Sequence, residues 1–131
     1  YTSAVIKLNR RSNLKTRMEY TCPLELTHDV TKGKWKPIIL WQLGKGRRSL
    51  SSLKKEILGI TQKMLMEQLK ELLEYGMVEK HTYAGYPLHV EYYLTKRGEH
   101  MLEAIAIMQE IGVEMMLEDN REEFLKEKGL I

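Results

Sequence analysis

The sequence predicts a single, mainly helical domain with one small β-hairpin, an α+β fold of the winged helix-turn-helix kind. Two short amphipathic segments, residues 50–57 and 62–75, flank a turn that contains Gly59. The period of the apolar residues then changes, and segments 77–83 and 90–94 read as two strands separated by turn-forming residues. A hairpin directly after the second of two such helices has the position of a wing.

Two further helices are expected before this unit. The first begins at Cys22-Pro23, because proline is tolerated in a first helical turn, and it ends at Gly33. The second occupies residues 35–43, with Pro37 in its first turn and a glycine beyond its end. It is too apolar to face water, so we expect burial of most of its side chains, which include Trp35, Ile38, Ile39, Trp41 and Leu43.

Residues with side-chain oxygens mark the starts of the remaining helices. Ser49 is expected to cap the helix over residues 50–57, Thr61 the next helix, and Thr95 a long last helix over residues 96–117. Helices this short must share one core to be stable. The inner faces carry apolar residues at helical spacing: Leu50, Leu53 and Ile57 in the first, and Leu65, Leu69, Leu72 and Leu73 in the second.

The 131-residue chain fits one domain, which we assign to residues 22–131, after an N-terminal arm at 1–21. Its net charge of +3 is unevenly distributed. Residues 32–100 carry 13 basic and seven acidic side chains, whereas residues 101–131 carry three basic and eight acidic ones. A basic middle suits a polyanion, and an acidic end would be repelled by one. A solvated surface of mixed charge is the alternative.

Composition also indicates a cytoplasmic protein. No run of 18 apolar residues is present to span a membrane, and residues 1–17 lack the apolar core of a signal peptide. The single cysteine, Cys22, cannot form an internal disulfide, as expected in a reducing compartment. We therefore expect a cytoplasmic location and no membrane partner.

The polar face of the helix over residues 62–75 is the candidate for reading DNA. An α-helix fits the major groove of DNA, and residues near its N-terminal end reach the base edges. Gln62 can bond adenine through its amide, and Lys63 can reach guanine or a phosphate. An ordinary solvated face is the alternative. The candidate residues of this recognition helix are Thr61, Gln62, Lys63, Met66 and Lys70.

Basic and aromatic residues around this helix are candidates for contacts that position the protein on the DNA backbone or in the minor groove. A helix N-terminus after Ser49 suits a phosphate, and the hairpin adds cations and aromatic rings. Solubilising surface charge, and tyrosines that pack back onto the domain, are the alternatives. The candidates are Arg47, Arg48, Ser49, Lys80, His81, Tyr83, Tyr86, His89, Lys96 and Arg97.

Residues 101–117 are apolar on nearly every face, which one small domain cannot cover. We expect a second subunit to cover part of this helix, although an intramolecular core helix is the alternative. The abundant methionines favour adaptable packing over a metal or cofactor site. The expected dimer seam consists of Leu102, Ile105, Met108, Ile111 and Met115.

Signals of an enzyme are poor. The sequence has no glycine-rich phosphate loop and no Ser-His-Asp arrangement in a recognisable setting. The four histidines are scattered and Cys22 stands alone, so no metal-binding spacing appears. We predict that the protein is not an enzyme and that it uses no metal or cofactor.

An ordered set of short motifs runs from Cys22 to about Leu102. It comprises Cys22-Pro23, Gly33-Lys34-Trp35, Gly46-x-Arg48, Ile60-Thr61-Gln62-Lys63-Met64-Leu65, Gly76-Met77-Val78 and Tyr86-Pro87-x-x-Val90-Glu91-Tyr92-x-Leu94-Thr95-x-x-Gly98. With these motifs the chain resembles the HxlR-type family of bacterial, MarR-like winged helix-turn-helix regulators. It departs from the family at Leu50, where phenylalanine is usual, and at Ser49, which stands at or beside a usual arginine.

The resemblance implies a homodimeric DNA-binding transcriptional regulator, which we expect to be a repressor acting on an inverted-repeat operator. It implies that the first and last helices build the dimer interface, with Leu24 on the first. Two recognition helices about 34 Å apart would then meet successive major grooves. In some relatives a cysteine matching Cys22 senses electrophiles or oxidants, and a helix N-terminus suits a reactive thiol. A structural role as a small apolar residue is the alternative.

Two other functions are also compatible with the sequence. A winged-helix module that binds another protein without reading DNA would explain the thin basic face and the acidic last helix. A small-molecule effector could bind in a pocket at the dimer interface without any chemistry taking place.

Overall fold

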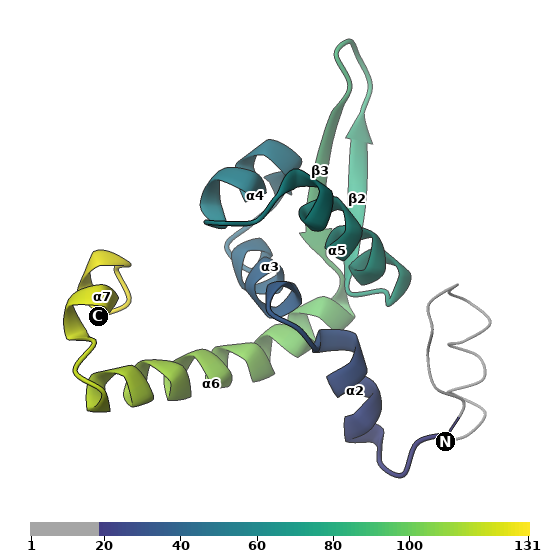
Figure 1. Cartoon of the computed structure of the whole chain (residues 1–131). Coiled ribbons are helices and arrows are strands. Elements are labelled where there is room, and N and C mark those ends of the chain that lie inside the picture. Colours follow the sequence, from purple (N-terminus) through teal and green to yellow (C-terminus); the bar gives the residue numbers. More distant parts are fainter. Residues whose placement is uncertain (1–18) are drawn as a thin grey trace.

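The computed structural model describes residues 19–131, with α3 at the centre of the molecule (Figure 1). Helices α4 and α5 pack on one side of α3, and α6 packs on another. The expected N-terminal arm lies, in its residues 1–18, outside the described residues. The elements in chain order are α2 (Pro23–Thr31), α3 (Trp35–Leu43), β1 (Arg48–Ser49), α4 (Leu50–Glu56), α5 (Gln62–Glu74), β2 (Val78–Tyr83), β3 (His89–Leu94), α6 (Lys96–Glu118) and α7 (Glu122–Glu127).

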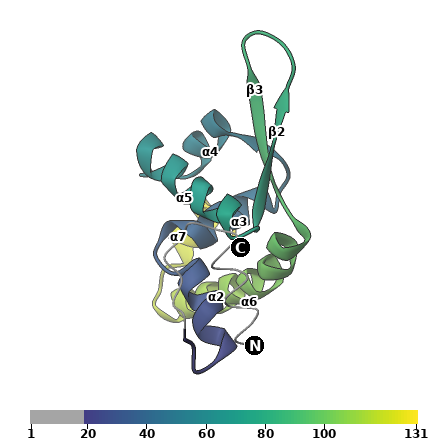
Figure 2. The same ribbon diagram turned by 90° about the vertical axis from the view of Figure 1, so that its right-hand side faces the viewer.

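The three strands form one antiparallel sheet in the order β1–β3–β2. Strands β2 and β3 pair from Val78 opposite Leu94 to Tyr83 opposite His89, which confirms the expected hairpin. The hairpin projects away from the helical body, as a wing does (Figures 1 and 2). The short strand β1 was not expected, and it pairs with the middle of β3, so the start of α4 is tied to the base of the wing.

The three expected helix caps are confirmed. The hydroxyl oxygen of Ser49 accepts a hydrogen bond from the backbone N–H of Ser52 at 3.2 Å, which starts α4. Thr61 does the same for the N–H of Met64 at 3.1 Å at the start of α5. The hydroxyl of Thr95 caps α6 and also donates to the carbonyl of Gly76 at 2.6 Å. Each cap satisfies a backbone donor that the first helical turn leaves unpaired.

The core forms where α3, α4 and α5 meet the base of the sheet. The expected inner face of α5 is buried at Leu65, Leu69 and Leu72, whereas Leu73 is half-buried at the edge. In α3 the aliphatic residues Ile39, Leu40 and Leu43 are buried, while both tryptophans lie partly exposed around them. The largest fully buried side chains outside α5 are Ile39, Leu40, Leu53, Ile60, Val78 and Leu125. This packing fixes α5 with its polar face outward.

Helix α6 begins against the core and then runs past it (Figure 1). Its residue Ile105 is buried in the core of its own chain, which corrects the expectation that this side chain faces a second subunit. Leu102 is half-buried close to Gly44, because a Cβ added at Gly44 would stand 2.5 Å from a Leu102 methyl carbon. In the next turns of α6 the side chains of Ile107, Ile111 and Met115 are exposed, whereas Val113 and Met116 are half-buried.

Helix α7, which the sequence did not predict, follows a turn at Asn120, whose φ is +59°. It folds back beside the end of α6 and is held by the fully buried Leu125 (Figure 1). Among residues 19–131, the structure has no helix that combines the length and the hydropathy needed to cross a bilayer.

Candidate nucleic-acid interface

The outer face of α5 is a continuous exposed strip. Gln62, Lys63, Met66, Glu67 and Lys70 are all exposed, whereas the leucines on the opposite face are buried. The strip exists because residues three and four apart share a face of a helix, and the leucines take the inner one. A helix presented in this way is free to enter the major groove of DNA.

Thr61 stands at the N-terminal end of this strip. Its side-chain oxygen accepts the capping hydrogen bond from Met64, so it fixes where the helix begins and where Gln62 and Lys63 lie relative to that end. An anion near this end would also benefit from the backbone N–H groups of the first turn. Among the candidate residues of the recognition helix, Thr61 therefore has a structural role as the N-cap of α5.

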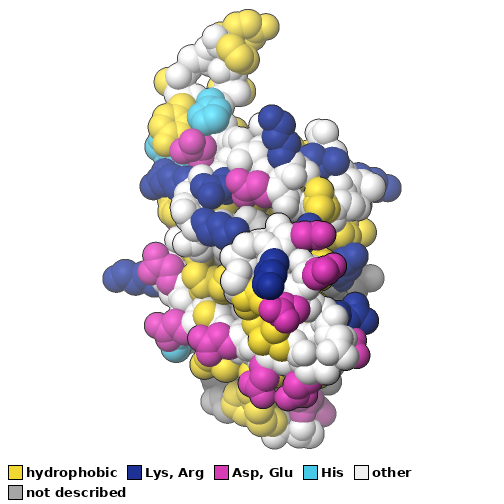
Figure 3. All heavy atoms as spheres, turned by 90° about the vertical axis from the view of Figure 1, so that its left-hand side faces the viewer, with side chains coloured by type: hydrophobic (Ala, Val, Ile, Leu, Met, Phe, Trp, Pro, Cys, Tyr) yellow, Lys and Arg dark blue, Asp and Glu magenta, His cyan; other side chains and the backbone are white. Residues whose placement is uncertain are grey.

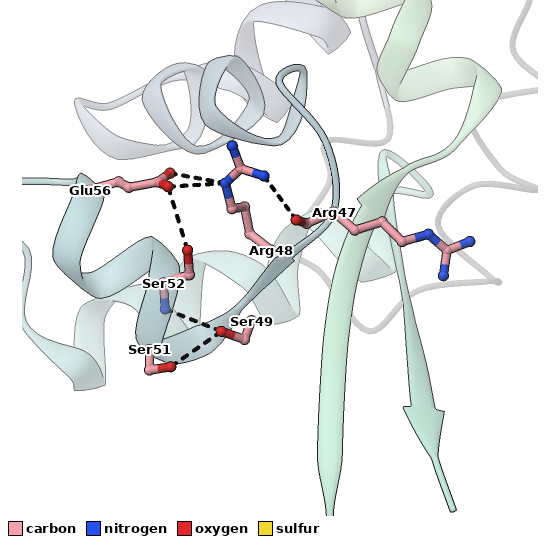
Figure 4. A network of polar contacts seen from close by, with 6 residues as sticks. All are labelled: Arg47, Arg48, Ser49, Ser51, Ser52 and Glu56. Carbon is pink, nitrogen blue, oxygen red and sulfur yellow. Dashed lines mark hydrogen bonds and ion pairs between the residues drawn. The ribbon is translucent and has the colours of Figure 1, made fainter.

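The two adjacent arginines before α4 point in different directions (Figure 4). The guanidinium of Arg48 lies 3.0 and 3.2 Å from the two carboxylate oxygens of Glu56, and it also donates to the carbonyl of Arg47 at 3.0 Å. The guanidinium of Arg47 instead lies over the ring of Tyr93, 4.2 Å from its centroid. Arg47 is exposed and Arg48 is half-buried, so Arg47 is the more accessible cation.

The same network holds the start of α4 (Figure 4). Ser49 Oγ lies 3.2 Å from Ser51 Oγ in addition to its capping bond, and Ser52 Oγ donates to Glu56 at 3.4 Å. Sequence reasoning missed Glu56 as the partner of Arg48. The sequence offered one signal for this pair: Glu56 lies near the end of the predicted helix 50–57, and Arg48 lies just before that helix begins.

The outer surface of the wing contains a carboxylate surrounded by aromatic and imidazole rings. Tyr83 donates a hydrogen bond to Glu91 at 2.9 Å, and His89 Nε2 lies 3.2 Å from the other carboxylate oxygen. The His81 ring packs edge-on against Tyr83, with centroids 4.5 Å apart. The hydrogen bonds from His89 and Tyr83 hold the pKa of Glu91 below its ordinary value. Sequence reasoning missed Glu91 as the centre of this cluster.

The tip of the wing is apolar and open to solvent. Tyr86, which precedes a cis proline, is fully exposed, and Leu88 is exposed as well. Tyr86 therefore does not pack back onto the domain, whereas Tyr83 is engaged by its neighbours on the hairpin. Lys80 is exposed on β2, next to His81.

Two basic residues at the start of α6 differ in their contacts. Lys96 is exposed. Arg97 donates from Nη1 to the backbone carbonyl of Tyr75 at 2.7 Å, and this carbonyl belongs to the C-terminal end of α5. A cation at a helix C-terminus is favourable because the last carbonyls there have no partner within the helix. Arg97 thus connects α6 to the recognition helix.

Charge is divided between the two ends of the molecule. Figure 3 shows Lys and Arg side chains gathered near the projecting hairpin, and Asp and Glu side chains mainly toward the opposite end. The basic end contains the candidate residues of α5 and the residues around β1. The acidic end contains most of α6 and α7, where the sequence has its excess of glutamate.

Cys22 is exposed at the N-cap position of α2, and its side chain makes no capping hydrogen bond. Leu24, two residues later, is exposed in the first turn of the helix. Within residues 19–131, no three His, Cys, Asp or Glu side chains come together in a way that could hold a metal ion.

A wing beside a helix-turn-helix whose second helix is exposed and polar is typical of DNA-binding transcription regulators. The chain belongs to the HxlR-like helix-turn-helix family, whose model matches residues 30–120. It is accordingly an HTH-type transcriptional regulator rather than an enzyme, as the motifs in the sequence implied.

Similar proteins support this membership. The chain is 40% identical over 103 residues to the regulatory protein MalR of Fusobacterium mortiferum, covering 78% of this chain and 97% of MalR. It is 41% identical over 83 residues to the HTH-type transcriptional regulator YkvN of Bacillus subtilis, covering 63% of this chain and 70% of YkvN. Among solved structures, the redox regulator HypR in its reduced form is 33% identical, with a TM-score of 0.67, and the match covers 80% of this chain and 99% of HypR.

Proposed function

We propose that the protein is a homodimeric transcriptional repressor that binds an inverted-repeat operator, with α5 in the major groove and the wing over the backbone and minor groove. The observation that carries this proposal is the exposed polar strip of α5, opposite the buried side chains of Leu65, Leu69 and Leu72. The strip includes an amide and two ammonium groups, which are side-chain types that bond base edges and phosphates. Such a regulator acts on the chromosome, and therefore in the bacterial cytoplasm.

The side chains of the strip have separate roles in this proposal. Gln62 lies at the N-terminal end and bonds adenine through its amide, while Lys63 bonds guanine or a phosphate. Met66, 53% exposed, offers an apolar contact to a thymine methyl group. Lys70 lies two turns further along and reaches the phosphate backbone, and Glu67 faces a base or solvent rather than a phosphate.

The surrounding cations position the protein on the duplex without reading sequence. Arg47, Lys80 and Lys96 are exposed and provide phosphate contacts. The half-buried Arg48 and the exposed Arg97 are both engaged by hydrogen bonds within the protein, and they act through the elements that they hold. The first turn of α4 after Ser49 offers backbone N–H groups to a phosphate. The wing contributes His81, His89 and Tyr83 at its sides and Tyr86 at its tip.

The dimer forms in this proposal through the uncovered face of α6, together with Leu24 of α2. Met108, Ile111 and Met115 are between 50% and 62% exposed, and Leu24 is 74% exposed. A contiguous row of large apolar side chains is unfavourable in water and marks an interaction surface. The exposed Ile107 belongs to this face, whereas Ile105 does not, because it is buried in the core of its own chain; Leu102 lies at the border of the face.

The experiment that tests DNA reading is a fluorescence-anisotropy titration of the protein with the DNA upstream of its own gene. We expect affinity to fall steeply with salt and to depend on a palindromic site. Lys63→Ala should weaken DNA binding and reduce the slope of log affinity against log salt concentration by about one, because it removes one cation that contacts a phosphate or a base edge. Lys126→Ala on the distant α7 is the matched control and should leave the slope unchanged.

A second variant separates reading from assembly. Ile111→Glu puts a charge into the proposed dimer face, so sedimentation should show monomers and operator affinity should fall with it. An intact dimer whose DNA affinity is flat with salt and insensitive to Lys63→Ala would contradict DNA reading. That result would favour a winged-helix module that binds another protein.

A redox-responsive version of this function is favoured by the exposed thiol of Cys22 and by the likeness to a protein described as a redox regulator. In this version an electrophile or oxidant modifies Cys22 beside the α2 part of the dimer face and lowers operator affinity. Treatment with diamide should weaken operator binding of the native protein and leave Cys22→Ser unaffected. Equal affinity of the treated and untreated native protein would exclude the sensor role.

A further inference from the structure

A groove of about 550 Å³ lies between α3, α6 and α7, away from the recognition helix. Trp41 of α3 contributes to one wall, Met116 of α6 to a second and Phe124 of α7 to a third. Helix α7 creates this groove, because the buried Leu125 holds it beside α6 while Phe124 stays partly exposed. Pockets of about 300–1,000 Å³ are typical sites for small molecules.

The charged side chains that line the groove are all positive. Lys45 and Lys128 contribute to its lining together with two glutamines, and none of the residues that line it is Asp or Glu. The ammonium of Lys128 lies 5.8 Å from the centroid of the Phe124 ring. A cation beside an aromatic wall suits a ligand with an anionic end and an apolar body. This cationic lining is unusual for the region, because residues 101–131 carry eight acidic side chains.

Gly112 leaves space on the α6 wall of the groove. A Cβ added there would meet no atom within 4 Å, so the position faces open volume rather than packed protein. Ile105, Gln109, Gly112 and Met116 follow one face of α6 at helical spacing and line the groove. Ile111 does not line it, so the groove and the proposed dimer face occupy neighbouring sides of the same helix, with Met108 at their border.

From these observations we infer that the groove binds a small organic acid with an apolar body, of the class of medium-chain or aromatic carboxylates. The carboxylate accepts charge-assisted hydrogen bonds from Lys45 and Lys128, and the apolar body lies against Trp41, Met116 and Phe124. Apolar walls with a few convergent polar groups provide affinity and orientation respectively. Nothing is transferred or broken, so the site is one of reversible binding.

The groove is connected to the recognition helix through α3. Pro37 lines the groove, and the adjacent Lys36 forms an ion pair with Glu71 of α5. A ligand between α3 and α6 changes the orientation of α3, and of the α4–α5 helix-turn-helix packed on it, relative to α6, which carries the proposed dimer face. The regulatory part of this inference rests on the proposed function. Operator DNA fixes the separation of two recognition helices, so a ligand that changes this separation lowers operator affinity. By thermodynamic linkage, DNA lowers ligand affinity by the same factor.

Ligand binding can be measured on the free protein by tryptophan fluorescence. The chain has two tryptophans, so Trp35→Phe leaves Trp41 as the single reporter within the groove. Octanoate is the anionic probe and octanamide its uncharged control. We expect a saturable change with octanoate and about tenfold weaker binding of octanamide, since a charge-assisted bond is stronger than a neutral one.

Three variants in this background test the assignment. Replacing both lysines, Lys45→Gln with Lys128→Gln, should abolish the preference for octanoate over octanamide. Gly112→Phe fills the open space and should weaken the binding of both probes at least about tenfold, because the apolar body of the probe can no longer be buried there. Lys126→Gln in α7, two residues before Lys128 but outside the groove lining, should leave both affinities within about twofold of the parent.

The inference is overturned if octanoate gives no saturable signal, or if the double lysine variant keeps the full preference for the acid. Absence of a signal, together with a shift from dimer to monomer in Gly112→Phe, would show that a second copy of the chain covers the groove. A separate titration of operator DNA in octanoate tests regulation, with an expected loss of affinity of about tenfold, the usual scale of allosteric coupling. If the protein binds no DNA at all, the proposed function is contradicted, but the fluorescence result on octanoate binding still stands. If octanoate binds saturably and operator affinity does not change, only the regulatory part of the inference is contradicted.

Discussion

Lys36 of α3 and Glu71 of α5 form an ion pair across the core, and the side chain of Lys36 is only 8% exposed. A lysine is rarely buried without a partner, because a charge loses its hydration there. The pair therefore fixes the recognition helix against the central helix at one defined point. Glu71 is more accessible, at 38% exposure of its side chain, so water shares in the solvation of this carboxylate.

The first prediction follows from that asymmetry. Glu71→Gln leaves the ammonium of Lys36 buried without its counter-charge, and it should lower the free energy of unfolding by about 1–3 kcal/mol. Lys36→Met removes the charge and keeps the apolar stem, so it should stay within about 1 kcal/mol of the native protein. Urea unfolding followed by circular dichroism measures both. A larger loss for Lys36→Met than for Glu71→Gln would refute this account of the pair.

Replacing each of two glycines of α6 by alanine should change the stability of the protein in opposite directions. At Gly98 an added Cβ would collide with the backbone carbonyl oxygen of Met77, which cannot move aside as a side chain can. Gly98→Ala should therefore destabilise the protein by at least about 2 kcal/mol through overpacking. Gly112→Ala meets open space and should stabilise it by about 1 kcal/mol, the difference in helix propensity between the two residues. Thermal unfolding of the two variants, side by side, checks the contrast.

The cap of the recognition helix gives a third prediction. Thr61→Ala removes the side-chain acceptor for the N–H of Met64 and should cost about 1 kcal/mol of stability. Thr61→Ser keeps an acceptor in the same place and should cost less than half of that. Operator affinity should fall in Thr61→Ala and persist in Thr61→Ser, because the first turn presents Gln62 and Lys63. Equal affinities of the two variants would show that the cap has no part in DNA reading.

The fourth prediction concerns Glu91 on the wing. Hydrogen bonds from His89 and from Tyr83 lower the pKa of its carboxyl below 4.5, the ordinary value. A carboxyl whose pKa is depressed in the folded state stabilises the hairpin above the ordinary pKa, and the contribution is lost as the pH falls through the lower, folded pKa. Carboxyl chemical shifts from NMR should therefore show Glu91 titrating below pH 4.5.

Two tyrosine variants test the cause of this shift. Tyr83→Phe removes one of the two donors and should raise the pKa of Glu91 toward its ordinary value. Tyr86→Phe changes a fully exposed side chain at the tip of the same hairpin and should leave the titration of Glu91 as it is. If both variants titrate like the native protein, the Tyr83 hydrogen bond does not contribute to the shift.

The order of helices, the hairpin and the caps at Ser49, Thr61 and Thr95 could be predicted from the sequence, because each has a local cause. Capping oxygens, glycine stops and the spacing of leucines act within a few residues of one another. The exposed strip of α5 follows from the same periodicity. The family motifs then gave a function that helix periodicity alone could not.

Other features depend on contacts between distant residues. Strand β1 has two residues, too few for an alternating pattern, and it exists because β3 offers it a partner. The tail around Leu125 has a charged sequence with few apolar residues, so its return onto α6 left no periodic signal. Ile105 looked like its exposed neighbours on α6 because a helix apolar on nearly every face does not reveal which face the core uses. The partners of Arg48 and Arg97 are likewise set by packing.

The separation of basic and acidic ends has a consequence for how the molecule meets a duplex. An approach with α6 and α7 foremost brings glutamates toward phosphates and is repelled, whereas the opposite orientation is attracted before any contact forms. We therefore expect the charges far from α5 to orient the encounter with DNA, whereas the lifetime of a bound complex would depend on contacts made by α5 and the wing.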